Sequence, residues 1–298
     1  MATKSRAIGS GKMPGSPSTM PCLIRPILSS TAREARPMED PVADGYDAVY
    51  AAWPASPTLQ GIWRRNAIGS DYPSGFEHIS FLTFAELQGI VEALHLRAGD
   101  RVLDLACGAG GPGLFAARQA RARLVGVDFS RVGIRLAARR AIDQRVDADF
   151  VVAVVTATAI AGARARGALS VDAMQYLPDK RAALREVWRV LAPGGRFAFT
   201  AFELDPERVA GLPVLGTDPV ADYAPLLGDA GFTVESYAET PDWQDRLDAT
   251  YRAVVGAHDT LMTEMGERAL GALLMEVSLT LELRPYRRRV LVVASKPS

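Results

Sequence analysis

A glycine-rich run with an acid on either side carries the clearest chemical signal in the sequence. The run Val102–Gly113 has glycines at the spacing of a turn that holds a nucleotide-like cofactor between a strand and a helix. Asp104 precedes the turn, and Asp128 follows it by roughly 20 residues, where an acid can accept the hydroxyls of a ribose. The spacing predicts a cofactor that contains adenosine, but it fits both a dinucleotide and S-adenosylmethionine (SAM).

The charge at the turn separates these two cofactors. A dinucleotide places an anionic pyrophosphate at the start of the helix, where Asp104 would repel it and Pro112 has no N–H to bind it. SAM carries a sulfonium and an ammonium, which an acid at the strand end attracts. The residues therefore favour SAM, and an NAD(P)-dependent oxidoreductase is the alternative.

The elements around the turn predict an α/β protein with a parallel sheet. Apolar runs indicate strands, and amphipathic segments indicate helices between them. We expect strands at 101–105, 123–127, 150–155, 167–171, 196–202, 232–238 and 288–294, and helices at 47–53, 81–96, 114–120, 130–141, 180–191 and 221–230. Alternation in this order places a ligand at the carboxyl ends of the strands.

Composition excludes several classes of protein. The chain has 298 residues, 48% of them hydrophobic, and its 34 basic side chains balance 34 acidic ones, so it lacks the basic field of a nucleic-acid-binding protein. Two cysteines and three histidines predict neither a disulfide framework nor a metal centre. Every apolar run is too short to span a membrane. We expect a cytoplasmic protein without metal, and composition leaves its oligomeric state open.

The chain divides into segments of different character. Residues 1–37 are rich in Ser, Pro, Gly and basic residues, which predicts a disordered tail or sequence upstream of a start at Met38, with a transit peptide as the alternative. The segments expected after it are an N-terminal helical cap at 38–96, a SAM-binding α/β core at 97–241, a helical lid insertion at 242–284 and a final core strand at 285–298.

Four motifs in order resemble class I SAM-dependent methyltransferases that act on small molecules, like those of quinone and sterol biosynthesis and of actinobacterial natural-product pathways. Val102–Gly113 matches the family's first motif, and Val125–Ser130 resembles the second. Ser170–Asp179 is similar to the loop that faces the methyl group, and Ala182–Phe197 resembles the helix, turn and strand that follow it. The resemblance implies a Rossmann-like, seven-stranded sheet with a helical cap, and SAM as the cofactor.

The resemblance also implies the cofactor site. In this family the acid of the second motif holds the ribose hydroxyls, here Asp128, and the next residue, Phe129, packs on adenine. The cofactor-binding residues expected in this way are Asp104, Ala106, Cys107, Gly108, Gly110, Asp128, Phe129, Ser130 and Ser170.

Residues for the acceptor are expected at the mouth of the pocket. His78 is the one histidine in a segment that could cover the pocket, and its neutral imidazole could accept a proton at pH 7; a structural role is the alternative. Asp172 and Gln175 could orient the acceptor, although Asp172 could instead cap its loop. Tyr46, Tyr176 and Trp243 are expected to line the acceptor pocket, with packing of the cap as the alternative for Trp243.

The segment Val151–Arg166 departs from the family pattern because it contains no acid. The family usually has an acidic or polar adenine contact after the third strand, and Val154 stands where Asp is expected. Either adenine is held by backbone groups and packing, or the reading frame is locally shifted. Losing one charge-assisted hydrogen bond would weaken binding by about 1.5 to 3 kcal/mol.

The function implied is SAM-dependent methyl transfer to a small, secondary-metabolite or quinone/polyketide-like acceptor. A lid of this size suits an enclosed small molecule, and 172–176 lacks the Asn/Asp-Pro-Pro-aromatic motif of base-modifying relatives, so no nucleic-acid partner is expected. Besides the oxidoreductase, a SAM-binding fold without methyl transfer, either pericyclase-like or inactive, is an alternative.

Overall fold

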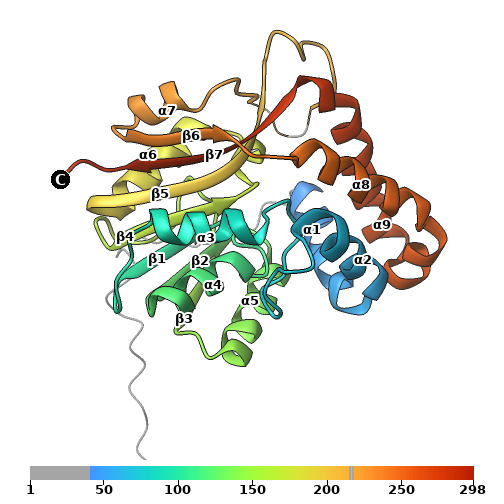
Figure 1. Cartoon of the computed structure of the whole chain (residues 1–298), viewed down its shortest axis with the longest axis horizontal. Coiled ribbons are helices and arrows are strands. Elements are labelled where there is room, and N and C mark those ends of the chain that lie inside the picture. The colour runs from blue at the N-terminus through green and yellow to red at the C-terminus, as the bar shows by residue number, and fades with distance from the viewer. Residues whose placement is uncertain (1–40, 215, 217) are drawn as a thin grey trace, which may run out of the picture.

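The computed structural model describes residues 41–214, 216 and 218–298, and this part of the chain folds around a seven-stranded sheet (Figure 1). The strand order is β3-β2-β1-β4-β5-β7-β6, with β1 to β5 parallel and β7 antiparallel to both of its neighbours. The strands are β1 (Arg101–Leu105), β2 (Arg123–Asp128), β3 (Ala148–Val152), β4 (Ala165–Val171), β5 (Leu191–Leu204), β6 (Thr233–Glu239) and β7 (Arg287–Ser295). The predicted fold class is confirmed, whereas the predicted tail and Met38 lie outside the described residues.

Helices cover both faces of the sheet because successive side chains of a strand point to opposite sides. Val102 and Leu124 belong to a core with α3 and α4, whereas Leu103 and Val125 belong to a second core with α6 and α7. The helices on the sheet are α3 (Phe84–Ala93), α4 (Gly111–Ala120), α5 (Arg131–Gln144), α6 (Lys180–Val190) and α7 (Ala224–Asp229). With both faces covered, the central strands can be continuously apolar.

Local signals in the sequence set where these helices begin. Ser130 caps α5 by accepting from the N–H of Gly133, and Asp179 caps α6 in the same way. Pro112 lies in the first turn of α4, as predicted, where its missing N–H costs no helical hydrogen bond. These caps fix the helix ends that border the carboxyl edge of the sheet.

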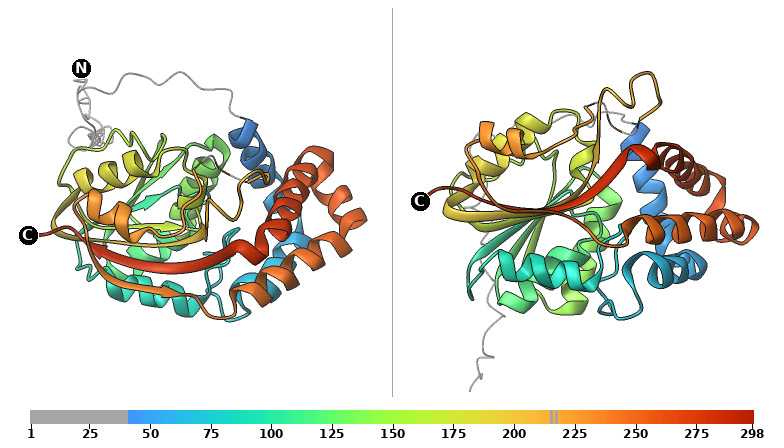
Figure 2. Two further views of the ribbon diagram at one scale, coloured as in Figure 1. Left: turned by 90° about the horizontal axis from the view of Figure 1, so that it is seen from above. Right: turned by 45° about the horizontal axis from the view of Figure 1, so that its top comes forward.

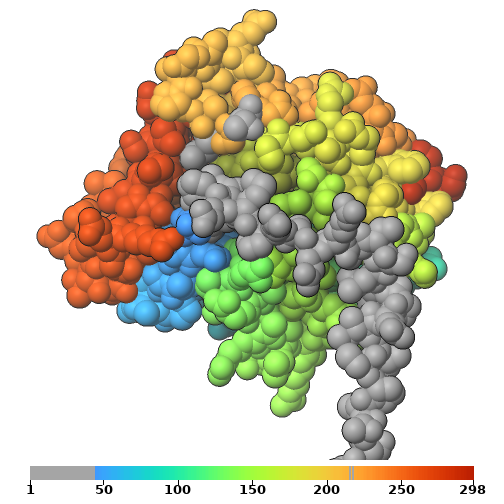
Figure 3. Space-filling view, turned by 180° about the vertical axis from the view of Figure 1, so that it is seen from behind, coloured from blue at the N-terminus to red at the C-terminus, as the bar shows by residue number. Residues whose placement is uncertain are grey.

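A second group of helices gathers at that edge and forms the cap (Figures 1 and 2). Its members are α1 (Pro41–Ala52), the short turn η1 (Trp53–Ala55), α2 (Pro57–Ile62), the π-helical segment η2 (Trp63–Ile68), α8 (Trp243–Gly256) and α9 (His258–Leu283). The view from behind shows α9, orange to red, packed against the blue N-terminal helices (Figure 3). Glu264 of α9 accepts hydrogen bonds from Ser56 Oγ at 2.6 Å and Thr58 Oγ1 at 2.7 Å, which joins the two halves of the cap.

The longest helix bends within the cap. α9 has 26 residues, and Gly266 interrupts it with a positive φ of 77° that a side chain would disfavour. None of the described helices is both long enough and apolar enough to cross a membrane.

One helix predicted within the cap segment at 38–96 belongs to the sheet instead. Leu87 and Ile90 of α3 are fully buried in the core shared with α4, so α3 lies on the sheet face and not over the carboxyl edge. An apolar stripe indicates that a helix packs on something but does not identify the partner.

The third strand is also shorter than predicted. The prediction places it at 150–155, but it runs from Ala148 to Val152, because its only partner, β2, ends at Asp128 opposite Val152. The chain then folds back on itself, burying Val155 and Ile160 while Val154 remains 54% exposed. Glu186 of α6 holds this acid-free segment by accepting from the N–H and hydroxyl of Thr158.

Candidate active site

The turn between β1 and α4 is built around Asp104. This side chain is 2% exposed and accepts the N–H of Gly113 at 3.1 Å. A Cβ at Gly113 would collide with the Asp104 carboxyl, so the position requires glycine. Gly108 and Gly110 have φ values of 51° and 76°, which let the chain reverse tightly beneath the ligand.

Asp128 joins the end of β2 to the same turn. Its Oδ2 accepts the N–H of Gly108 at 2.7 Å, and its Oδ1 accepts the N–H of Ser130 at 2.7 Å. A carboxylate has about four lone-pair positions, so each oxygen can accept a further hydroxyl. This geometry fits a carboxylate that binds the two hydroxyls of a ribose.

The two acids make the turn electrostatically negative. Burial raises the pKa of Asp104 to about 8, against the opposing hydrogen bond from Gly113, and burial raises the pKa of Asp128 to about 6. No arginine or lysine in the described part of the chain forms an ion pair with either acid. A buried pair of this kind favours a cationic ligand, because the cation stabilises the ionised carboxylates. The sulfonium and ammonium of SAM meet this requirement.

A narrow cavity of about 50 Å³ lies beside the turn. Its walls include Tyr50 and Trp53 from the cap, His78, and Asp104 and Cys107 from the turn. Tyr50 lies directly over the turn, since a Cβ at Gly108 would collide with its hydroxyl. Ala106 also lines the cavity, and burial raises the pKa of the Cys107 thiol, so Cys107 is a packed neutral side chain.

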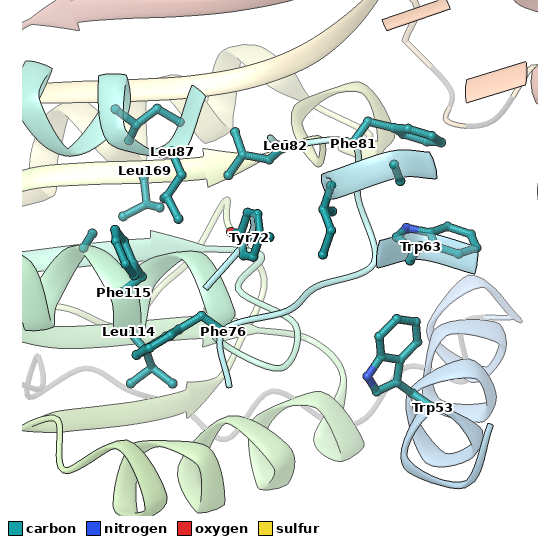
Figure 4. Close-up of a cluster of buried hydrophobic side chains, with 14 of the residues drawn as sticks. Trp53, Trp63, Tyr72, Phe76, Phe81, Leu82, Leu87, Leu114, Phe115 and Leu169 are labelled. Carbon is teal, nitrogen blue, oxygen red and sulfur yellow. The ribbon is translucent and has the colours of Figure 1, made fainter. Parts of the chain in front are cut away.

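Aromatic residues connect this site to the cap. Figure 4 shows Phe115 and Tyr72 on the sheet side and Trp63 and Trp53 on the cap side of one continuous apolar cluster. The Trp53 and Trp63 rings meet edge to face with centroids 6.5 Å apart. These contacts continue the apolar core from the sheet into the cap.

His78 lies at the cavity, but its chemistry differs from the prediction. Burial lowers its pKa to about 3, and Nδ1 is 2.6 Å from Ser80 Oγ. Its Nε2 is buried without a hydrogen-bond partner among the described residues. With so low a pKa the imidazole stays neutral and is a weak base, which disfavours the predicted proton transfer and leaves Nε2 available to a ligand.

Asp172 and Gln175 are both used by the protein itself. Asp172 binds Arg289 Nε at 2.9 Å and Nη2 at 3.2 Å, and it accepts the N–H of Phe81 at 2.9 Å. Although burial opposes it, the charge and hydrogen bonds of Arg289 lower the pKa of Asp172. Gln175 donates to the Asp172 carbonyl and accepts the N–H of Phe202. The carboxylate of Asp172 is thus paired with Arg289, which disfavours its predicted role in orienting the acceptor. The Gln175 amide keeps one N–H beyond these two hydrogen bonds, so its role stays a prediction.

Arg289 is the centre of this network, and the sequence motifs do not reveal it. The guanidinium is completely buried and also binds Glu86 Oε1 at 2.9 Å and Thr240 Oγ1 at 3.0 Å. It therefore ties β7 to α3 and to the loop after β4.

Three predicted residues do meet above the turn. The ring of Tyr46, on α1, lies 6.0 Å from that of Phe129 and 6.2 Å from that of Tyr176. These side chains come from the cap, the end of β2 and the loop after β4. The structure thus places Tyr46 between the expected adenine-packing residue, Phe129, and the second expected acceptor residue, Tyr176.

The other predicted residues have structural partners. Ser170 Oγ donates to the Leu105 carbonyl at 2.9 Å, and Ser130 Oγ donates to Asp47 of α1. Trp243 is 2% exposed, donates to Glu239 and packs on Phe202, so packing explains it better than an acceptor pocket does.

Comparison with known proteins agrees with this geometry. Residues 102–195 match the family model described as a methyltransferase domain. The chain is 27% identical to methyltransferase GfsG of Streptomyces halstedii, over 66% of this chain and 75% of that protein. It is also 27% identical to 27-O-demethylrifamycin SV methyltransferase of Amycolatopsis mediterranei, over 70% and 81% of the two chains. It is 30% identical to phosphoethanolamine N-methyltransferase 1 of Triticum aestivum, but spans only 33% of that protein.

Solved structures share the fold. The [4+2]-cyclase SpnF has a TM-score of 0.70 at 19% identity, covering 86% of this chain and 95% of that one. Geranyl diphosphate C-methyltransferase from Streptomyces coelicolor, solved with S-adenosyl-L-homocysteine, has a TM-score of 0.62 at 19% identity, covering 88% and 100%. The sheet order and the negative glycine turn define a protein of the class I methyltransferase fold. The matched methyltransferase domain and these relatives support SAM-dependent methyl transfer, with SAM as the cofactor.

Proposed function

We propose that the protein transfers the methyl group of SAM to an oxygen of an apolar, polyketide-like small molecule enclosed beneath the cap. The observation that carries this proposal is the pair of buried acids at the glycine turn, which suits a cationic cofactor, directly beneath an aromatic cap. The oxygen acceptor is supported by the name of the Amycolatopsis relative, which methylates a 27-O-demethyl compound. The absence of a nucleic-acid partner and a cytoplasmic location remain predictions from composition.

The residues of the turn divide the binding of SAM among them. Asp104 would attract the cationic methionine end, Asp128 would accept the ribose hydroxyls, and Phe129 would pack on adenine. His78 Nε2 is available to hydrogen-bond the same cofactor. Since the segment after β3 supplies no acid, backbone groups there would complete the adenine site.

SAM supplies a methyl group on a positively charged sulfur, so the protein mainly has to align the acceptor, exclude water and accept a proton. Tyr46 and Tyr176 lie where the cap meets the loop after β4 and would contact the acceptor. The aromatic cluster of the cap would keep water out during the transfer.

Calorimetry and mass spectrometry test the proposal together. The protein is titrated with SAM, S-adenosylhomocysteine and NADH, and then incubated with SAM and a panel of phenols, alkyl alcohols and amines of polyketide size. We expect binding of the first two ligands and a product heavier by one methylene. Binding of NADH alone would contradict the cofactor, and binding of SAM without any product would favour a fold that has lost transfer.

A further inference from the structure

A second polar cluster lies in the cap and is linked to the glycine turn by Tyr50, whose hydroxyl lies against Gly108 and whose pKa is raised by burial and by the charges of both Asp128 and Glu276. Glu276 of α9 accepts the hydroxyl of Tyr176 at 3.2 Å. Tyr46 of α1 and Tyr251 of α8 lie around the same carboxyl, close enough that its charge raises the pKa of both phenols, for which burial is the larger cause. Three cap helices and the loop after β4 thus converge on one carboxylate.

Glu276 differs from most acids of this region because its partner is a neutral hydroxyl and not a cation, as is also the case for Glu264 on the same helix. Asp172 and Glu86 bind the buried Arg289, Asp248 binds Arg284 and Arg252, and Glu264 caps α2. No arginine or lysine within the described residues lies within ion-pair distance of Glu276. Its carboxyl retains accepting capacity that the fold does not use.

A buried cation near the cluster is also unsatisfied. Arg287, at the start of β7, is 7% exposed, and its Nε has no hydrogen-bond partner among the described residues. Its guanidinium stacks over the Phe202 ring at 5.4 Å, and its charge acts on both Glu276 and Tyr176. A buried N–H without a partner is costly, so Arg287 Nε is available to donate to an oxygen of a ligand.

The electrostatics suit proton transfer. Burial raises the pKa of Glu276, and the Tyr176 hydrogen bond and the Arg287 charge only partly oppose this. Tyr46, Tyr50, Tyr176 and Tyr251 face the carboxyl from α1, the loop after β4 and α8, and Arg287 faces it from β7. A carboxylate with a raised pKa is a stronger base at neutral pH than an ordinary one.

We propose that Glu276 is the base that accepts the proton of an acidic hydroxyl, of a phenol or an enol, while Arg287 binds a second oxygen of the same acceptor. The acceptor O–H bond breaks and its proton moves to Glu276, the oxygen forms a bond to the methyl carbon, and the electrons of the C–S bond remain on sulfur. The proton then passes to water. This inference rests on the proposed methyl transfer and names its acceptor class.

The test compares Glu276→Gln with Glu282→Gln, which alters an exposed glutamate on the same helix. The acceptors are 1-naphthol and 4-nitro-1-naphthol, whose nitro group ionises the hydroxyl at neutral pH without a base. We expect Glu276→Gln to lower kcat for 1-naphthol by about 100- to 10,000-fold, to remove the rise of kcat with pH, and to affect the nitro compound far less. Glu282→Gln should leave both rates and the SAM dissociation constant unchanged.

Other outcomes separate the two proposals. Equal losses for both naphthols, or no loss, would overturn the role of Glu276 while methyl transfer stands. Transfer only to alkyl alcohols or amines would overturn the phenol or enol class and keep the proposed function. If the unaltered protein methylates nothing in the panel, both proposals fail.

A stability measurement excludes misfolding as the cause of a lost rate. The pKa of Glu276 is higher in the folded protein than in the unfolded chain, so Glu276 contributes to stability at low pH, where it carries a proton. That contribution is lost as the pH rises from the pKa of the unfolded state through the pKa of the folded state. Glu276→Gln should therefore unfold at an equal or higher temperature than the unaltered protein at pH 8. A lower unfolding temperature would mean that the carboxylate stabilises the cap, and would contradict its assignment as a poised base.

Discussion

At the scale of single residues, the cofactor site depends on carboxylates with few partners. Each carboxylate oxygen of Asp128 accepts one backbone N–H and retains a lone pair that could accept a hydroxyl of a ligand. The carboxylate of Asp172 accepts hydrogen bonds from the Arg289 guanidinium and from the N–H of Phe81. The two acids have the same side chain, but Asp172 is paired with the Arg289 cation, whereas Asp128 has no cationic partner among the described residues and is therefore better suited to bind a ligand.

Asp128→Asn should weaken SAM binding by about 10- to 100-fold, because it replaces charge-assisted hydrogen bonds to the ribose with neutral ones. Calorimetric titration measures this change. Asp143→Asn, at an exposed position on α5, is the matched control and should bind SAM normally. Equal affinity in the unaltered protein and Asp128→Asn would contradict the ribose contact.

SAM affinity should increase with pH. Asp104, with a pKa of about 8, and Asp128, with a pKa of about 6, still carry protons in the free protein where ordinary carboxyls do not. A cationic ligand favours the ionised forms, so binding releases protons and strengthens as the pH rises from 5.5 to 8.5. Calorimetric titrations at pH 7 in buffers of different ionisation enthalpy measure the number of protons released. The Asp104→Asn variant should release fewer protons than the unaltered protein. An unchanged count would show that Asp104 does not respond to the cofactor.

The motifs predicted the glycine turn because its residues are close in sequence. Gly108 and Asp128 are 20 positions apart, and their contact follows from one strand, one turn and the next strand. The partner of Asp172 could not be predicted in this way, since Arg289 lies 117 positions away and no local pattern marks it. Glu276 was missed for the same reason, because α9 brings it to Tyr176 across 100 positions.

At the scale of elements, the strands and helices on the sheet were predicted from apolar patterns, and the errors lie where tertiary contacts decide. β3 ends early because its only partner, β2, ends opposite Val152, and α3 packs on the sheet because its apolar stripe fits the core of α4. The residues of α2 and η2 were not predicted as helical, although the buried Leu59, Ile62 and Trp63 have helical spacing.

Arg289→Met should lower the free energy of unfolding by about 3 to 5 kcal/mol, because it leaves Asp172 and Glu86 buried without their cation. Urea unfolding measures the loss, and Arg139→Met at an exposed position of α5 should cost little. Adding Asp172→Asn to Arg289→Met should recover part of the loss, since it removes an unpaired charge. Additive losses in the double variant would show that the two residues do not interact.

At the scale of the whole molecule, the cap and the sheet enclose the cofactor site between them. α1 contributes Tyr50 above the glycine turn and Asp47 at the start of α5, where it accepts from Ser130 Oγ and the N–H of Val132. Because α1 supplies residues on two sides of the turn, it should gain order when a ligand fills the space between it and the turn.

SAM binding should slow amide hydrogen exchange in α1 and η2 more than in α7, which packs at the opposite side of the sheet. Mass spectrometry of peptic peptides with and without SAM measures this difference. Equal protection of α1 and α7 would indicate general stabilisation by mass action and no direct closure of α1 on the cofactor.

The position of β7 has a consequence for how the protein is made. β6 pairs only with β7, and β7 follows the two helices α8 and α9 in the chain. During synthesis β6 therefore has no strand to pair with until residues 287–295 have left the ribosome, and its polar backbone edge stays open while the cap helices emerge. An unpaired strand edge is a site for pairing with other chains, so β6 stays open to such association until β7 has been made.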